Sequence, residues 1–214
     1  MNTITLRNTL PDVFLQRADI QSDVWLQEVV FEKEKNYLVE ANSGTGKSSL
    51  CSYIYGFRKD YQGNIFFNQT NIHDLSIRQW VEQRKGHLSL MWQELRLFLE
   101  LTAMENVLIK NKLTDYQKRK TIDEWFERLG IADKRDALVG RMSFGQQQRV
   151  ALIRALCQPF DFILVDEPIS HLDDSNSRIM ADMLVEEAKR QGAGVIATSI
   201  GKRIELNYDE QYKL

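Results

Sequence analysis

Short runs of apolar and β-branched residues recur along the chain and predict its strands. They lie at 37–39, 65–67, 87–92, 160–165 and 194–198. The run at 160–165 is of the type that is buried on both faces in a parallel sheet. The first forty residues alternate or are rich in strand formers, which predicts an antiparallel β layer.

Stretches with helical spacing of apolar residues separate these strands. They cover 47–56, 75–84, 103–112, 116–129, 144–157 and 174–191. Three successive helices over 94–157 predict a helical insert in a single domain of residues 1–214. The core of that domain would combine residues 1–93 with residues 158–214. The last dozen residues predict an edge hairpin.

Composition and charge narrow the class of protein. The chain has 214 residues, 28 basic and 30 acidic side chains, and a net charge of −2. Without a polycationic surface, we expect no nucleic-acid partner. Cys51 and Cys157 follow no metal-binding spacing, so we expect buried thiols in a reducing compartment. Because no apolar run is long enough to span a bilayer, we expect a cytosolic protein or one held at a membrane by a partner.

Residues 41–49 predict a phosphate-binding loop between a strand and a helix. Gly44 and Gly46 allow the backbone to approach an anion, and the following helix directs its N–H groups and its dipole toward that anion. Lys47 would then reach the β- and γ-phosphates, and the Ser48 hydroxyl would bind Mg²⁺. The alternative is a plain Gly/Ser-rich turn, which the position directly after a strand disfavours.

Two carboxylates, Asp166 and Glu167, follow the buried run at 160–165. Ligands of open parallel sheets collect at the carboxyl ends of the strands, so these acids would lie beside the bound phosphates. Asp166 could hold Mg²⁺, and Glu167 could polarise the attacking water. The alternative is a pair of solvated acids at a strand end.

Ser143 and Gln146 have the spacing of a capping box, which alone could explain the pair. The run at 142–149 also resembles the signature sequence of ATP-binding cassette (ABC) ATPases, where Leu-Ser-Gly-Gly-Gln opens a helix. Other motifs of that family occur in its usual order. They are a Walker A loop at 41–49, a Q-loop glutamine at Gln93, a helical-subdomain stretch at 101–107, a Walker B strand at 162–167 and a D-loop at 170–173.

The resemblance covers nearly the whole chain and implies both a fold and an assembly. It implies a P-loop NTPase core with a mostly parallel sheet, an N-terminal antiparallel layer and an inserted helical subdomain. It also implies a head-to-tail dimer of two copies around two ATP molecules, in which Ser143 of one copy meets the γ-phosphate held by the other. Gln93 would sense Mg²⁺ and the attacking water.

The same resemblance assigns roles to individual residues. The catalytic group would be Glu167, Lys47 and Gln93, and the Mg²⁺ ligands would be Ser48, Gln93 and Asp166. The nucleotide contacts would be Phe14, Asn42, Ser43, Gly44, Thr45, Gly46, Lys47, Ser48, Ser49, Ser143, Gly145, Gln146, Asp173 and Ser199.

Adenine recognition in the family relies on an aromatic ring about two dozen residues before the Walker A loop. Phe14 has suitable spacing, and Trp25 is the less favoured candidate. The alternative for Phe14 is a core position in the β layer.

Three positions depart from the family pattern. Ala41 takes the place of the first glycine, so it must adopt a negative φ or accept strain of roughly 1–2 kcal/mol. Phe144 replaces a signature glycine. Ser199 stands where the family has its switch histidine, and a hydroxyl cannot replace an imidazole although it can donate a hydrogen bond.

These features predict a cytoplasmic ATPase subunit that powers a separate transmembrane subunit at the inner face of the cell membrane. Because of Ser199, we expect hydrolysis to be slower than in a full site by ~10–10³-fold. A nucleotide-dependent regulatory scaffold with little turnover is the alternative. A cassette in DNA repair or translation is a further alternative, but the long coiled-coil insertion or second cassette of those relatives is absent.

Overall fold

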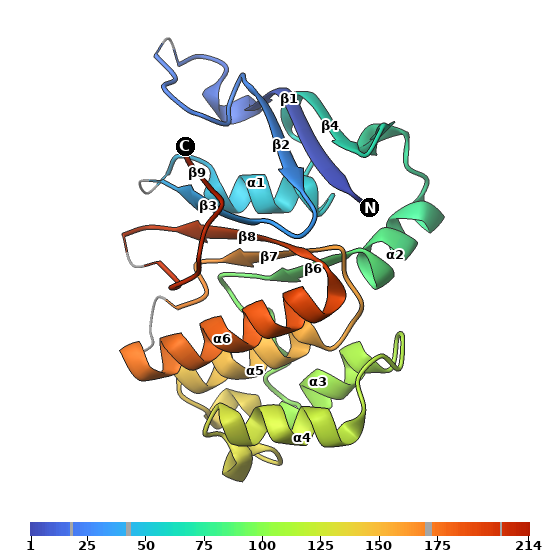
Figure 1. Cartoon of the computed structure of the whole chain (residues 1–214), viewed down its shortest axis with the longest axis vertical. Helices are drawn as coiled ribbons and strands as arrows, with labels where there is room; N and C mark the ends of the chain where they lie inside the picture. The colour runs from blue at the N-terminus through green and yellow to red at the C-terminus, as the bar shows by residue number, and fades with distance from the viewer. Residues whose placement is uncertain (18, 42–43, 170–172, 202) are drawn as a thin grey trace.

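Two β-sheets and six α-helices make up the described part of the chain (Figure 1). The computed structural model describes residues 1–17, 19–41, 44–169, 173–201 and 203–214. One sheet is antiparallel, with strand order β2-β1-β4-β5, and the other has strand order β6-β7-β8-β3-β9. The predicted α/β class, with an N-terminal antiparallel layer and a parallel sheet, is confirmed.

The antiparallel sheet forms around the first strand. Its members are β1 (Thr3–Pro11), β2 (Glu28–Glu32), β4 (Tyr61–Phe67) and β5 (Thr70–Asn71). The β1–β4 register shifts between Arg7 and Leu10. Gly63 lies at this irregularity with φ +84°, and a Cβ there would come within 2.2 Å of the Asn8 carbonyl oxygen. The bend therefore requires glycine at position 63.

The second sheet divides the apolar residues into two cores. Its strands are β3 (Asn36–Glu40), β6 (Leu88–Met91), β7 (Phe162–Asp166), β8 (Gly194–Ser199) and β9 (Glu210–Lys213). Side chains alternate between its faces. Phe162 and Leu164 pack with the antiparallel layer, whereas Ile163 and Val165 pack with the helices on the other face.

The predicted C-terminal edge hairpin is wrong. The strand β9 pairs in parallel with β3, with Tyr37 opposite Glu210. Asn36 fixes the start of this pairing, because its carbonyl accepts from the Asp209 amide at 2.8 Å and its amide donates to the Asp209 side chain at 2.8 Å. The chain thus adds one more parallel strand at the free edge of β3 instead of folding back on itself.

The helices follow the predicted positions closely. They are α1 (Lys47–Ile54), α2 (Ile77–Gly86), α3 (Ala103–Asn111), α4 (Arg119–Arg128), α5 (Phe144–Leu156) and α6 (Asp174–Gln191). Helix α4 begins three residues later than predicted. The Asn111 side chain accepts from the Gln117 amide at 2.9 Å and donates to the Gln117 carbonyl at 2.9 Å, which holds the preceding segment as a turn.

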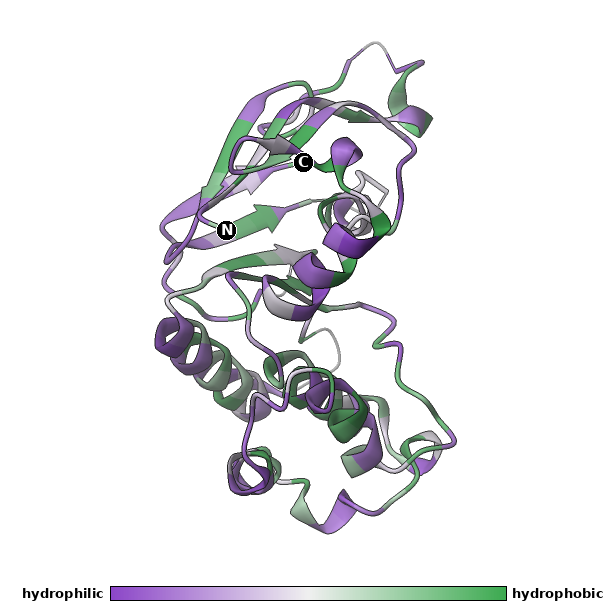
Figure 2. Cartoon of the chain, turned by 90° about the vertical axis from the view of Figure 1, so that its right-hand side faces the viewer, coloured by the Kyte–Doolittle hydropathy of each residue, from purple (hydrophilic) through white to green (hydrophobic). Residues whose placement is uncertain are grey.

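The helices lie on both sides of the parallel sheet. Helices α5 and α6 run below it, with α3 and α4 farther out, whereas α1 lies between it and the antiparallel layer (Figure 1). The view in Figure 2 shows hydrophilic and hydrophobic residues on different sides of the outer helices, as expected for helices that cover a core. Within the described ranges, no helix is both long enough and apolar enough to cross a membrane.

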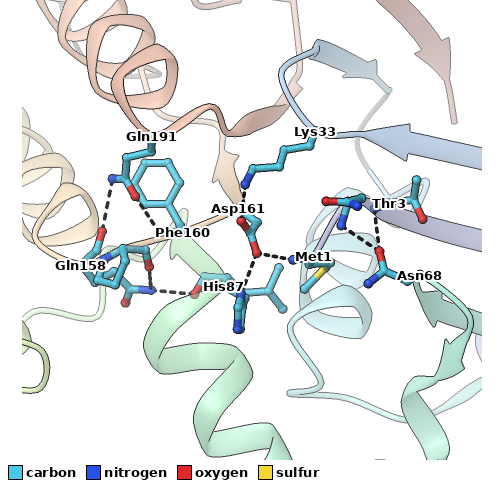
Figure 3. A network of polar contacts seen from close by, with 12 residues as sticks. Met1, Thr3, Lys33, Asn68, His87, Gln158, Phe160, Asp161 and Gln191 are labelled. Carbon is cyan, nitrogen blue, oxygen red and sulfur yellow. Dashed lines mark hydrogen bonds and ion pairs between the residues drawn. The ribbon is translucent and has the colours of Figure 1, made fainter.

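A carboxylate, Asp161, lies just before β7 and connects the two sheets (Figure 3). It accepts hydrogen bonds from the Met1 amine, from Lys33 Nζ at 2.5 Å and from His87 Nδ1 at 2.6 Å. Burial opposes ionisation of Asp161, but these hydrogen bonds outweigh burial and hold its pKa below the ordinary value. Met1 and Lys33 belong to the antiparallel layer, so the carboxylate joins that layer to β7.

Candidate functional site

The carboxyl ends of four parallel strands meet at one edge of the second sheet. The register places Glu40 of β3 opposite Ser199 of β8, and Thr198 of β8 opposite Asp166 of β7. Segments that leave these ends therefore gather in one place. They surround a cavity of about 310 Å³, whose lining includes Phe14, Gly46, Lys47, Ser48, Gln93 and Glu167.

The backbone of the loop before α1 depends on two glycines. Gly44 has φ +80° and Gly46, the N-cap of α1, has φ +100°. Because Gly46 has no side chain, the first N–H groups of α1 remain available to an anion. Ala41 is not among the described residues with positive φ, so the alanine at the first position requires no left-handed backbone. Asn42 and Ser43 lie outside the described residues.

Two aromatic rings, those of Trp25 and Phe14, pack against this loop at Gly46. A Cβ on Gly46 would lie 3.1 Å from Trp25 Cζ2 and 3.2 Å from Phe14 Cε2. The Trp25 indole N–H donates to the Thr45 carbonyl at 3.0 Å. Trp25 is 2% exposed, so its ring lies in the core and supports the loop from the inner side. The sequence did not predict this support, because Trp25 and Thr45 belong to two loops that lie 20 residues apart.

Lys47 lies at the start of α1 and is 6% exposed. Its Nζ is 3.3 Å from Glu167 Oε1. Glu167 directly follows β7 and has φ +49°, an uncommon conformation for a residue with a side chain. Lys47 and Glu167 thus form an ion pair in the cavity, although they lie 120 positions apart in the sequence.

Four further polar side chains meet beside this ion pair. The Ser48 hydroxyl donates to Gln93 Oε1 at 3.4 Å, and the Thr198 hydroxyl donates to Asp166 Oδ1 at 2.5 Å. Burial raises the pKa of the Asp166 carboxyl, and hydrogen bonds from Thr198 and Ser48 offset part of this effect. Sequence reasoning missed Thr198, since the pairing of β7 with β8 cannot be read from the local sequence.

The donor set has the chemistry that a hard divalent cation requires. Ser48, Gln93 and Asp166 offer hydroxyl, amide and carboxylate oxygens, which are the ligands that Mg²⁺ prefers. A bound cation would also compensate the buried Asp166 carboxyl, whose ionised form is disfavoured by burial. The residues present therefore fit a polyphosphate with its Mg²⁺.

Phe14 lies in the 3-10 helix η1 (Asp12–Phe14) and lines the cavity, although it is only 5% exposed. Its ring packs on Gly46, and the Arg17 guanidinium lies 4.2 Å from the ring centroid. The two alternatives for this residue are thus compatible, because a core ring also borders the cavity. Ser49 is engaged by Arg58, whose Nη1 donates to the Ser49 hydroxyl at 2.9 Å.

The predicted signature residues form the start of α5 and do not line the cavity of their own chain. Ser143 and Gln146 make the predicted capping box. The Gln146 amide donates to Ser143 Oγ at 3.3 Å, and the Ser143 amide donates to Gln146 Oε1 at 2.9 Å. Gly145 lies in the first turn, and Phe144 is 40% exposed. The turn thus presents a hydroxyl and helix amides to the surface.

Asp173 caps α6 and lies near the signature helix. Its carboxylate accepts from the Asn176 amide at 2.9 Å, and this hydrogen bond lowers the pKa of Asp173. The Arg149 guanidinium of α5 donates to Asn176 Oδ1 at 3.2 Å and to the Gly145 carbonyl at 3.1 Å. Arg149 therefore ties the start of α6 to the signature turn. The D-loop residues 170–172 lie outside the described residues.

Ser199 ends β8 and is 2% exposed. Its carbonyl accepts from the Ala41 amide at 3.2 Å, which joins β8 to the first residue of the loop. The next residue, Ile200, lines the cavity beside Lys47 and Glu167. The buried Ser199 therefore stands where the family has a histidine, and the neighbouring side chain that lines the cavity, Ile200, is apolar.

The comparisons with known proteins agree with this architecture. Residues 28–170 match the ABC transporter family, and the chain belongs to that family. It is 31% identical over 152 residues to the lipoprotein-releasing system ATP-binding protein LolD of Buchnera aphidicola, which covers 69% of this chain and 66% of LolD. It is 37% identical over 134 residues to the Fe(3+) ions import ATP-binding protein FbpC of Fusobacterium nucleatum. That match covers 61% of this chain and 34% of the relative.

Solved structures share the fold. The bacterial ABC transporter cassette MJ0796, solved as a dimer, has a TM-score of 0.78 at 23% identity, over 92% of this chain and 87% of that chain. A dimeric post-hydrolysis state of the same cassette, bound to ADP and Pi, has a TM-score of 0.72 at 21% identity. The particular fold is therefore that of an ABC cassette.

Proposed function

We propose that this chain is an ATP-binding and ATP-hydrolysing subunit that dimerises around two ATP molecules and powers a separate transmembrane subunit. The observation that carries the proposal is the meeting of Lys47, Ser48, Gln93, Asp166 and Glu167 at one edge of the parallel sheet. Membership of the ABC transporter family supports it. The relatives are named as ATP-binding proteins of import and lipoprotein-release systems.

The residues divide the work of phosphoryl transfer. Lys47 and the amides of the loop and of α1 hold the phosphates, and Ser48, Gln93 and Asp166 hold Mg²⁺, which supplies electrostatic stabilisation of the transferred phosphoryl group when bound. Glu167 orients the attacking water and accepts its proton. The 3.3 Å ion pair between Lys47 and Glu167 holds both side chains in the cavity, and the lysine exchanges this partner for phosphate. Phe14 borders the adenine.

The signature residues complete the site of a second copy. Ser143, Gly145 and Gln146 lie at an exposed helix start and not on their own cavity, so they are available to ATP held by another subunit. Asp173, which Arg149 connects to that turn through Asn176, would lie at the same dimer seam. The dimeric state of the MJ0796 cassette supports this arrangement.

The membrane partner would engage the surface beside Gln93. By family resemblance, the helical subdomain and this surface dock a helix of the transmembrane subunit, which places the dimer at the inner face of the membrane. ATP binding would close the dimer and hydrolysis would reopen it, so the partner would be driven through its two states.

Turnover should be slow because of the switch position. Ser199 is buried and Ile200 lines the cavity, so no imidazole reaches the γ-phosphate from β8. If turnover were negligible, the same site would serve the second candidate function, a nucleotide-dependent scaffold that dimerises and regulates its partner.

The decisive experiment measures ATP-induced dimerisation and phosphate release on the same purified protein. We expect both, with slow release, and we expect E167Q to keep ATP binding and dimerisation while release falls by about 10²–10⁴-fold. The matched control is E94Q, since Glu94 directly follows Gln93 and its side chain is 65% exposed. Dimers without phosphate release would favour the scaffold, and absence of ATP binding would refute both functions.

A further inference from the structure

A second cavity, of about 130 Å³, adjoins the cavity that contains Lys47. Phe14 lines both cavities. Thr45 lines the second cavity, whereas its neighbours Gly44 and Gly46 line the first. A nucleotide whose phosphates occupy the first cavity can therefore place another part of the molecule in the second.

Phe14 itself offers little ring surface to such a ligand, because it is only 5% exposed. One edge of the ring packs at Gly46, where an added Cβ would lie 3.2 Å from Phe14 Cε2. The Arg17 guanidinium lies over the ring, 4.2 Å from its centroid. Arg17 also lines the second cavity. A group that enters this cavity therefore meets a guanidinium where the sequence predicts an aromatic ring.

The local backbone explains why Arg17 reaches this ring. The Arg17 amide donates to the Phe14 carbonyl at 2.9 Å, so residues 14–17 form a turn. Such a turn brings its first and fourth residues together. Arg17 is exposed, so its guanidinium can cover the ring and still reach solvent. The stack is thus a consequence of chain geometry at the end of η1.

Another part of the wall of the second cavity is fixed to strand β9. Ser22 lines the cavity, and its hydroxyl oxygen accepts from the Trp25 amide at 2.9 Å. The Asp23 amide donates to the Lys213 carbonyl at 2.8 Å, and the Lys213 amide donates to Asp23 Oδ2 at 2.8 Å. Leu214, which follows Lys213, lines the cavity too. The cavity is therefore built against the edge of the parallel sheet.

A guanidinium has the chemistry to hold a nucleobase at this place. It is planar, charged and only weakly hydrated, and it stacks on aromatic faces. Stacking on a planar side chain, with a cation–π contribution from arginine, is a common way to bind a base. The Phe14 ring holds one face of the Arg17 guanidinium, which leaves the other face for a base.

We infer that Arg17 is the surface on which the base of the nucleotide stacks, with Phe14 behind it as a support. The family resemblance instead implies that the aromatic ring itself stacks on adenine. Phe14 still borders the base, but the group in contact with the face of the base is the guanidinium. This inference rests on the proposed function, because it takes the phosphates to lie beside Lys47.

The test measures the affinities of two probes by calorimetry, at a dilution where the protein is monomeric. AMP-PNP with Mg²⁺ carries a base, and inorganic tripolyphosphate with Mg²⁺ does not. R17A removes the guanidinium, whereas R17K keeps a charge but has no planar group.

The matched control is R7A, which removes another arginine that lies over a phenylalanine ring of the same layer. The Arg7 guanidinium is 5.2 Å from the Phe66 ring centroid and pairs with Glu28 at 3.2 Å. Arg7 is not among the described residues that line either cavity.

We expect R17A and R17K to weaken AMP-PNP binding by about tenfold, the scale of one stacked base, and to keep tripolyphosphate binding within about twofold. R7A should keep both affinities. Equal losses for the two probes would show that Arg17 acts on the phosphates, and would overturn the inference. Unchanged AMP-PNP binding by R17A or R17K would also overturn it, as would the same loss in R7A. If wild type bound neither probe, the proposed function would fail as well.

Discussion

Gly46 illustrates how tightly single residues define the loop. Its φ of +100° and the two rings below it both require glycine, and the Trp25 hydrogen bond to Thr45 prevents the indole from retreating. Gly44, by contrast, has φ +80° but open space around it. Gly44 is therefore required only by its backbone conformation, whereas Gly46 is required by its conformation and by the two rings beside it.

Alanine substitutions at these two positions should differ in their cost. We expect G44A to lower the free energy of unfolding by roughly 1–2 kcal/mol, the cost of a left-handed residue with a Cβ. We expect G46A to cost roughly 2–4 kcal/mol, because an overpacked contact with Phe14 and Trp25 is added. Urea unfolding measures both. If both substitutions lowered the free energy of unfolding equally, the rings of Phe14 and Trp25 would move aside without a cost in stability.

The switch position allows a direct test of slow turnover. We expect S199H to raise phosphate release by about tenfold or more, the scale of one added transition-state donor. S199N is the matched control, since it enlarges the side chain without adding an imidazole, and it should not raise the rate. Steady-state release by the dimer is the measurement. No gain with S199H would refute the idea that the missing imidazole limits turnover.

At the scale of elements, periodicity predicted all six helices, because each has an apolar face that covers a core. Boundaries differed where polar side chains bind the backbone locally, as Asn111 does with Gln117. The C-terminal segment was predicted wrongly, since its pairing with β3 depends on a sheet edge far away in sequence. Local sequence carries little information on such pairings.

The contact between the two sheets should depend on pH through Asp161 (Figure 3). Its pKa is lower in the folded protein than in the unfolded chain, so the unfolded chain takes up the proton first as pH falls. The stabilisation is therefore complete above the ordinary aspartate pKa of ~3.9 and is lost as pH falls through the lower folded value.

We expect D161N to lower the free energy of unfolding near pH 7 by about 2 kcal/mol, on the scale of lost charge-assisted hydrogen bonds. The difference from wild type should shrink as the pH falls below ~4. The control is D133N, which removes an exposed pair with Lys134 and should leave the unfolding midpoint unchanged. Urea titrations at several pH values give the result, and a difference independent of pH would contradict this role for Asp161.

At the scale of the whole molecule, the sequence predicted the fold class and the groups that gather at the sheet edge. Motif spacing allowed this, because parallel strands place their carboxyl ends together. It did not predict the packing of Phe14 and Trp25 against Gly46 or the hydrogen bond from the Thr198 hydroxyl to Asp166. Each of these contacts joins segments that are distant in sequence, and only the packing of the layers brings them together.

The central claim is that each ATP site combines Lys47 of one copy with Ser143 of another. Mixing K47A with S143R tests it most directly, since each variant alone leaves both sites of its dimer damaged. In a mixed head-to-tail dimer, one site keeps an intact lysine and an intact serine. The account predicts that phosphate release by an equimolar mixture recovers to about a quarter of the wild-type rate, because half of the dimers are mixed and each has one intact site. A mixture as inactive as either variant alone, with both variants folded, would contradict the shared site.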